Sequence, residues 1–165
     1  MNTKDQECCP EFNPQKWDKK IFSWENRRFI KETIPTLFHM PFPPMISQKI
    51  TSMMKLATSA NKVDVQKDEV LILFQDPSPF RSNIYLSVNG EVPRANNIKL
   101  SGTFMAKVYD GPNNAIPKFV KDMNSFLEKE GKKIPKDDSY YVHYAYCPKC
   151  MKKYGHQYMI LFARI

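Results

Sequence analysis

Apolar residues recur along the chain with two periods, and the period changes in a fixed order. Residues 27–41 alternate apolar and polar side chains, which predicts a β-strand, and Pro35 places that strand at an edge or a bulge. Residues 43–62 return to apolar side chains once per helical turn, which predicts an amphipathic helix. Two short apolar runs follow at 69–74 and 82–88, so the first half predicts a strand, a helix and two further strands.

The second half of the chain repeats this order of patterns. Residues 97–112 keep apolar side chains on one side of an extended chain, which predicts a long strand. Gly102 interrupts that strand and indicates a bulge or the close approach of another backbone. Residues 139–146 and 157–165 are rich in aromatic and aliphatic side chains, so two more strands are expected to close the sheet.

An amphipathic helix is predicted between these strands, over residues 113–131. Asn113 or Asn114 supplies a side chain for the N-cap, and Gly131 provides the stop. In both halves the helix begins about sixteen residues after the first strand does, and the next strand begins about twenty-five residues later. These matching intervals predict a duplicated β-α-β-β unit.

A single unit of this kind would bury little apolar surface, so two units are expected to pair their sheets. We therefore predict an α+β fold in which duplicated β-α-β-β units form an antiparallel sheet with two helices on one face. The main body is expected to span residues 28–165. Residues 1–27 are expected to form an N-terminal arm tied to the C-terminal hairpin, since without a tie such an arm should fray.

Basic residues outnumber acidic ones, which gives a formal net charge of +8 and a pI of about 9.3. They are spread along the chain, and the densest clusters, KEGKKIPK and KCMKK, fall at a helix end and a turn. This distribution favours a solvated basic surface. Nucleic acid is therefore not expected as a partner, while an acidic protein partner stays open.

No apolar run approaches the ~20 residues that a membrane span needs, so no membrane association is expected. The first residues, MNTKDQECCPEFNPQKWDKK, are polar and lack the apolar core of a signal peptide. A cytoplasmic location is therefore expected. Thiols stay reduced there, and paired cysteines bind metal more often than they form disulfides.

The four cysteines form two close pairs at opposite ends of the chain. Cys147 and Cys150 have the spacing of a zinc knuckle, and Cys8 with Cys9 could complete a tetrahedral site. The sequence therefore predicts a structural zinc at these four residues. A catalytic zinc is not expected, because four thiolates leave no open position. Two alternatives stay open: three cysteines completed by His156 or water, and reduced or redox-active thiols.

Two segments resemble the GyrI-like small-molecule-binding domain, the effector-binding domain of some AraC- and MerR-type regulators. They are QDPSPFRSNIYLSVNGEVP and LSGTFMAKVYDGPNNAIPKFVKDMNSFLEKEG, and the similarity spans roughly residues 28–165. Within that family the chain is most similar to stand-alone proteins that share CCPEF, a following Trp and CPKC…YG, and that are loosely named hydrolases. No helix-turn-helix segment is evident, so the resemblance implies a ligand-binding pocket without an attached DNA-binding segment.

The resemblance implies two SHS2-like modules with a ligand held in a groove between the repeats. A pocket walled by Trp and Tyr suits flat or cationic organic molecules. In many relatives a Glu lies on the strand before the last turn, whereas this chain has Val142, His143 and Tyr144 there. The predicted ligand-binding residues are Trp24, His39, Tyr85, Tyr109, Tyr141 and His143.

Three functions are compatible with these residues. The leading prediction is the binding of a hydrophobic or aromatic small molecule, with zinc in a structural role. The second is a hydrolase that acts on such a molecule. The third is a module that binds and inhibits another protein. Whether the chain is an enzyme stays open at this stage.

For the hydrolase, water would be activated by His143, Tyr144 or Glu32. His143 could act as an acid or base near neutral pH, although a hydrogen-bonded histidine within the sheet is the alternative. Glu32 shares the alternation of the first strand and could face the groove, where burial would raise its pKa. An ion pair of Glu32 with Arg27 or Arg28 at the surface is equally compatible with the pattern.

Overall fold

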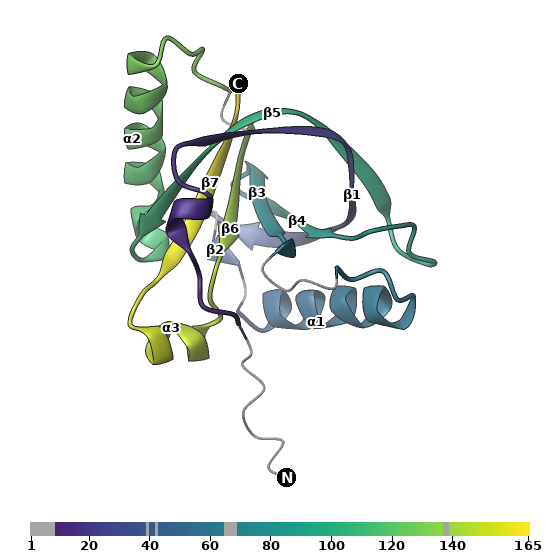
Figure 1. The fold of residues 1–165 in the computed structure, drawn as a ribbon. Helices are drawn as coiled ribbons and strands as arrows, with labels where there is room; N and C mark the ends of the chain where they lie inside the picture. The colour runs from purple at the N-terminus through teal and green to yellow at the C-terminus, as the bar shows by residue number, and fades with distance from the viewer. Residues whose placement is uncertain (1–8, 39, 42, 65–68, 137–138) are drawn as a thin grey trace.

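An antiparallel sheet closes into a barrel and carries helices on its outer surface (Figure 1). The computed structural model describes residues 9–38, 40–41, 43–64, 69–136 and 139–165. Within these ranges the strands are β1 (Lys20–Leu37), β2 (Met40–Pro41), β3 (Ile72–Ser78), β4 (Arg81–Ser87), β5 (Asn97–Asp110), β6 (Tyr140–Tyr144) and β7 (Tyr158–Arg164). The helices are α1 (Pro43–Ser59), α2 (Ile116–Lys129) and α3 (Pro148–Tyr154), with 3-10 turns η1 (Pro14–Lys16) and η3 (Asn113–Ala115).

The barrel closes because β1 is long enough to pair with two different strands. Residues 29–35 of β1 pair with β4, and residues 20–30 pair with β5. The ring then runs β1-β4-β3-β6-β7-β5 and returns to β1, while the short β2 lies outside it at the end of β1. All these pairings are antiparallel, and closure leaves none of the six ring strands with an open edge.

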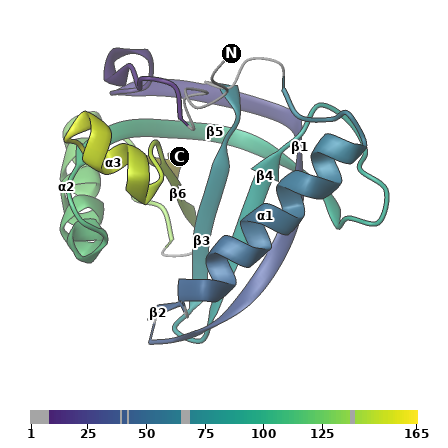
Figure 2. The ribbon, with the colours of Figure 1, turned by 90° about the horizontal axis from the view of Figure 1, so that it is seen from below.

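The two helices that flank the sheet pack on the outer surface of the barrel, at separate places (Figure 2). Met53 and Ala57 of α1 lie over one set of strand residues that includes Ile30 and Ile84. Met123 of α2, with Leu127, lies over another set that includes Met105 and Leu161. Burying a Met or Leu side chain contributes about 1.5–3 kcal/mol, so Met53, Met123 and Leu127 help to hold the two helices on the sheet.

Strand residues that alternate with those under the helices point into the barrel. They form an inner cluster that contains no helix residue and is dominated by aromatic rings. The buried members of the inner cluster are Trp17, Trp24, Phe29, Leu71, Leu73, Tyr85, Phe104, Ala106, Tyr141, Ile160 and Phe162.

The predicted α+β class and the antiparallel sheet are confirmed. The predicted order of strand, helix, strand and strand appears in both halves, as β1-α1-β3-β4 and β5-α2-β6-β7. The sequence patterns did not predict the closure of the sheet into a barrel. None of the described helices is long and apolar enough to cross a membrane.

Several local predictions need correction. Asn113 and Asn114 were expected to cap the second helix, but they lie in the turn η3, and the N-cap of α2 is Ala115, which makes no side-chain cap bond. The cap prediction is wrong because the chain leaves Pro112 through a 3-10 turn before α2 begins. Gly131 follows the helix with a φ of +68°, as expected for a glycine stop.

The cluster KCMKK was expected to fall at a turn, but it lies within the helix α3. Cys147 is the N-cap of α3, Pro148 takes the first helical position, and Gly155 ends the helix with a φ of +70°. The first strand also starts earlier than predicted, at Lys20, so only the described residues 9–19 precede the barrel. These residues, which include η1, are called the arm below.

Candidate functional site

Three of the four cysteines meet where the arm reaches α3. Cys9 comes from the arm, Cys147 caps α3, and Cys150 lies in the first turn of that helix. The three sulfur atoms lie within 4.8 Å of one another, so the three cysteines could hold a metal ion. Cys8, the fourth predicted ligand, lies outside the described residues.

Hydrogen bonds around the cysteines hold the arm against the C-terminal hairpin. The backbone N–H of Cys147 donates to Sγ of Cys9 at 3.4 Å, and the Tyr154 hydroxyl donates to the Cys9 carbonyl at 3.3 Å. The backbone N–H of Phe12 donates to the hydroxyl of Tyr146 at 2.8 Å. The Tyr146 and Tyr154 rings stack at 4.6 Å, so the hairpin presents a preformed surface to the arm.

The chemistry of the three thiols suits a soft metal ion. Burial raises the pKa of the Cys9 thiol; the Cys147 N–H opposes this shift, and the Cys147 and Cys150 thiols add to it. Neighbouring thiols that cannot all ionise in a partly buried place become good ligands when a cation compensates their charge. His156, the alternative ligand, is not part of this group, since its Nδ1 contacts Asp110 Oδ2 at 2.8 Å and its ring stacks on Tyr158.

The inner cluster brings three of the predicted ligand-binding residues together. Trp24 contacts Phe104 with ring centroids 4.5 Å apart, and Tyr141 contacts the same Phe104 at 5.9 Å. Tyr85 meets Tyr141 edge to face at 5.7 Å. The three side chains are 4–8% exposed, so the rings cover one another inside the barrel.

Polar groups that sequence reasoning missed accompany these rings. The Tyr85 hydroxyl donates to Gln75 Oε1 at 2.7 Å, and Nδ2 of Asn83 donates to the same oxygen at 3.2 Å. The Thr33 hydroxyl donates to Asn83 Oδ1 at 2.8 Å. The alternation along the strands could have predicted them, because the side chains of these residues point to the same face of the sheet as the rings.

Two cations lie over the same rings. The Arg27 guanidinium lies 4.9 Å from the Trp24 ring and 5.8 Å from the Phe29 ring, and Nζ of Lys31 lies 5.7 Å from the Tyr85 ring. Burial lowers the pKa of Arg27, while Asp64 and Glu69 oppose that shift. The inner side of β1 is therefore both aromatic and basic.

His143 lies on the inner face, where its ring contacts the backbone of the neighbouring strand. Its Nδ1 is 3.1 Å from the backbone nitrogen of Ile72 and 3.2 Å from the backbone oxygen of the same residue. Burial lowers the pKa of His143 to about 4, and the Arg27 charge adds to that effect, while the bond to Ile72 opposes it. The imidazole is thus neutral near pH 7 and acts as a hydrogen-bonded histidine of the sheet.

The other catalytic candidates lie on the opposite face. Tyr144 packs edge to face on Phe74 at 5.3 Å, and burial, with the Asp76 charge, raises its pKa to about 12. Glu32 pairs with Lys49 of α1 at 3.5 Å, on the outer surface. The structure therefore does not bring His143, Tyr144 and Glu32 together.

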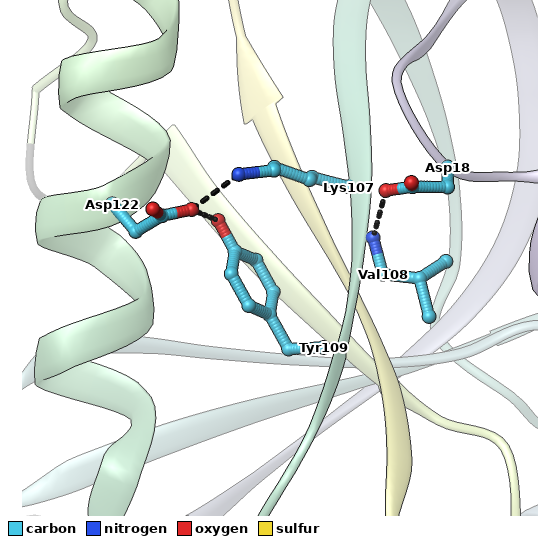
Figure 3. A network of polar contacts seen from close by, with 5 residues as sticks. All are labelled: Asp18, Lys107, Val108, Tyr109 and Asp122. Atoms are coloured by element: carbon cyan, nitrogen blue, oxygen red, sulfur yellow. Dashed lines mark hydrogen bonds and ion pairs between the residues drawn. The ribbon is translucent and has the colours of Figure 1, made fainter.

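Of the remaining predicted ligand-binding residues, Tyr109 is not in the inner cluster. His39 lies outside the described residues. Tyr109 lies under α2, where its ring stacks on Phe119 at 4.5 Å and its hydroxyl donates to Asp122 Oδ2 at 2.7 Å (Figure 3). Lys107 contacts the same carboxylate, and this network joins β5 to α2.

A pocket of about 290 Å³ opens where β1 pairs with β5. Arg28, Asn97, Ile98 and Lys99 line it. None of these residues was predicted to bind a ligand. One of the lining residues, Ile98, also packs against the inner cluster.

The full length of the chain, residues 1–165, matches the model of a family described as "Bacterial hydrolase". The chain belongs to that family. No curated protein matches the sequence.

Solved structures share the fold at low sequence identity. An uncharacterized conserved protein from Listeria innocua has a TM-score of 0.63 at 10% identity and covers 88% of this chain and 92% of its own. A hydrolase encoded by lin2189 from Listeria innocua has a TM-score of 0.61 at 11% identity, with 90% and 92% covered. SAV2435 bound to tetraphenylphosphonium has a TM-score of 0.52 at 11% identity, with 88% and 92% covered. These similarities show that the chain has the same fold as the three solved structures.

Proposed function

We propose that the protein binds a hydrophobic, aromatic small molecule through the rings that line the inside of the barrel. The observation that carries this proposal is the meeting of Trp24, Tyr85 and Tyr141 on one surface, with the polar groups of Gln75 and Asn83 beside them. Ring faces supply apolar contact area, and a few hydrogen-bonding groups fix the orientation of a ligand.

The likeness to SAV2435 supports a ligand of this class. That protein binds tetraphenylphosphonium, a molecule made of aromatic rings around a cationic centre, and it shares the fold of this chain. We propose further that the two β-α-β-β halves are duplicated units of the GyrI-like type and that the site lies between them. The strand orders β1-β4-β3 and β5-β7-β6 repeat the same connection, which supports a duplication. A cytoplasmic location is proposed with it.

We propose zinc as the metal at Cys9, Cys147 and Cys150, in a structural role. Zn²⁺ favours thiolate ligands in tetrahedral geometry, and a donor set of three sulfurs with one further ligand matches that preference. Cys8 is the proposed fourth ligand because it adjoins Cys9.

A panel of aromatic ligands tests the binding function. Tetraphenylphosphonium and planar neutral or anionic aromatics are titrated into the full chain by calorimetry. Tyr85→Leu removes an inner ring and is expected to raise Kd about tenfold for any ligand that binds. Tyr109→Leu removes a ring of the same type from the outer surface and should leave Kd unchanged. Equal effects of the two variants, or no binding across the panel, would refute the proposal.

A hydrolase is the second candidate, and the description of the family favours it. His143, Tyr144 and Glu32 are the proposed groups for activating water, although Tyr144 and Glu32 lie on the outer face. Turnover of p-nitrophenyl acetate is measured for the wild type and for His143→Gln. If the rate of the wild type exceeds that of buffer and the variant retains it, His143 is not the catalytic base.

A further inference from the structure

We propose that a metal ion on Cys9, Cys147 and Cys150 fastens the arm over the inner cluster and thereby controls access to the rings. This inference rests on the proposed binding function. It assigns to the metal site a role in admitting the ligand, besides its role in stability.

The arm reaches the inner cluster through two side chains: Trp17 is a buried member of the cluster, and Phe12 packs against it. Trp17 is 7% exposed, its ring lies 5.2 Å from that of Phe22, and it meets Phe162 edge to face at 6.2 Å. Trp24 contacts the same Phe162 at 5.3 Å. Trp17 therefore covers Phe162, the ring against which Trp24 packs, and moving Trp17 away would expose the side of the inner cluster that leads to Trp24.

The path of the arm explains why the cysteines govern the position of Trp17. In Figure 1 the arm passes α3 and turns at η1, in front of β7. Asn13 caps η1 by accepting a bond from the Gln15 N–H at 3.1 Å, and Trp17 follows this turn directly. Trp17 lies only eight positions after Cys9, so a fixed Cys9 limits how far the tryptophan can move.

Away from the cysteines, the described contacts of the arm are individual side-chain contacts and hydrogen bonds, not a strand ladder. Lys16 pairs with Glu69 at 3.0 Å, but both side chains are 40–49% exposed, and such pairs contribute little. Asp18 accepts a bond from the Val108 N–H at 3.0 Å (Figure 3), and Phe12 packs on Tyr158 at 5.3 Å. The barrel wall, in contrast, is held by continuous ladders such as β5–β7. Of the described segments that cover the rings, the arm is the one that can move without breaking the sheet.

Fluorescence quenching tests whether metal fastens the arm. The chain has two tryptophans, so Trp24→Phe leaves Trp17 as the single emitter. Acrylamide quenching is measured on the zinc-loaded variant and on the variant stripped with a chelator under reducing conditions. We expect quenching to increase severalfold on stripping, while the far-UV circular dichroism spectrum shows that the barrel stays folded. Unchanged quenching would overturn the inference.

Ligand binding tests whether the arm controls access. Tetraphenylphosphonium is titrated into the wild type with and without zinc. If the arm is open in about one tenth of the zinc-loaded molecules, stripping should lower the apparent Kd about tenfold. Asp18→Ala removes a hydrogen bond that holds the arm to β5 and leaves the thiols unchanged, so it should lower Kd in the same direction, by less. If zinc changes the quenching of Trp17 but leaves the Kd for tetraphenylphosphonium unchanged, control of access by the arm is refuted.

The two proposals fail in different ways. If neither form binds tetraphenylphosphonium or any other aromatic in the panel while Trp17 quenching still responds to zinc, the binding function fails, and control of access fails with it. The fastening of the arm would then stand alone. If the ligand binds and the quenching of Trp17 is the same with and without zinc, the binding function stands and the fastening of the arm by metal is refuted.

Discussion

The backbone N–H of Cys147 donates a hydrogen bond to Sγ of Cys9 at 3.4 Å, across 138 positions of the chain. Bonds from N–H groups to sulfur are worth little by themselves, but they orient the sulfur toward the other thiols. The arm and α3 thus meet through atoms that are also suited to bind a metal.

Replacing one thiol should remove the metal and weaken the fold. Cys150→Ser changes a buried sulfur and is expected to abolish zinc retention after dialysis. Stability should fall by about 4 kcal/mol, the linkage term for free zinc at about a thousand times Kd. Elemental analysis and urea unfolding check these outcomes. Lys149→Ala is the matched control on an exposed neighbour, and a serine variant that keeps zinc would contradict the site.

Stability should depend on pH through His143. Burial lowers the pKa of this histidine to about 4 in the folded chain, against about 6.5 when unfolded. The unfolded state therefore binds the proton first, so stability is present above about pH 6.5 and is lost as the pH falls toward 4. The full loss corresponds to roughly 3 kcal/mol, of which about 2 kcal/mol falls between pH 7.5 and pH 5.

Urea unfolding at pH 7.5 and pH 5 measures this effect in the wild type and in His143→Gln. The variant should lose most of the pH dependence in this interval, because glutamine cannot titrate. If NMR shows that His143 titrates near pH 7 in the folded protein, the neutral imidazole would be contradicted and an acid–base role would be favoured.

The network between β5 and α2 should contribute to stability at neutral pH. Tyr109→Phe removes the hydroxyl that donates to Asp122 and is expected to cost about 0.5–1.5 kcal/mol. Bonds from Lys107 and Tyr109 hold the pKa of Asp122 below its usual range. The stabilisation it provides is therefore present above the unfolded pKa, near 4, and is lost as the pH falls further.

Acid unfolding of Asp122→Asn checks this assignment. The variant should be less stable than the wild type at pH 7 and should lose less stability between pH 4 and pH 2. Asp110 also has a lowered pKa: burial alone would raise it, but bonds from His156 and from the Gln157 N–H outweigh burial. Asp110→Asn is therefore needed as a parallel variant, and identical acid curves for all three proteins would contradict the network.

Gly102 should resist substitution. Its φ is +150°, and a Cβ at this position would lie 3.2 Å from Nε of Arg164. Gly102→Ala is expected to cost more than about 1 kcal/mol, because alanine strains this backbone conformation. Lys99→Ala, at an exposed site on the same strand, should stay within about 0.5 kcal/mol of the wild type in thermal unfolding.

The periodicity of the sequence predicted most elements, and its failures have physical causes. The first part of β1 was missed because a bulge between Trp24 and Arg27 breaks the alternation, and Asn26 within it has a φ of +51°. Closure of the barrel depends on pairing between this part and β5, which is far away in sequence. No local pattern encodes such a pairing.

The candidate-site residues were also predicted only in part. The alternation along β6 correctly places Tyr141 and His143 on one face and Tyr144 on the other, but it does not say which face is inside. Tyr109 was grouped with the inner rings because it is aromatic, although its parity on β5 points outward. α3 was missed because a short helix leaves little periodic signal, even though Pro148 and Gly155 mark its ends.

The separation of the cysteines along the chain also bears on biosynthesis. Two of the three clustered sulfurs belong to residues 147 and 150, so a ribosome must translate past residue 150 before the cluster can assemble. A nascent polypeptide that stalls before α3 lacks these two sulfurs and cannot assemble the cluster. The proposed metal could therefore be captured only after α3 has been made, and the arm of a product that stops earlier would have no thiols to fasten it.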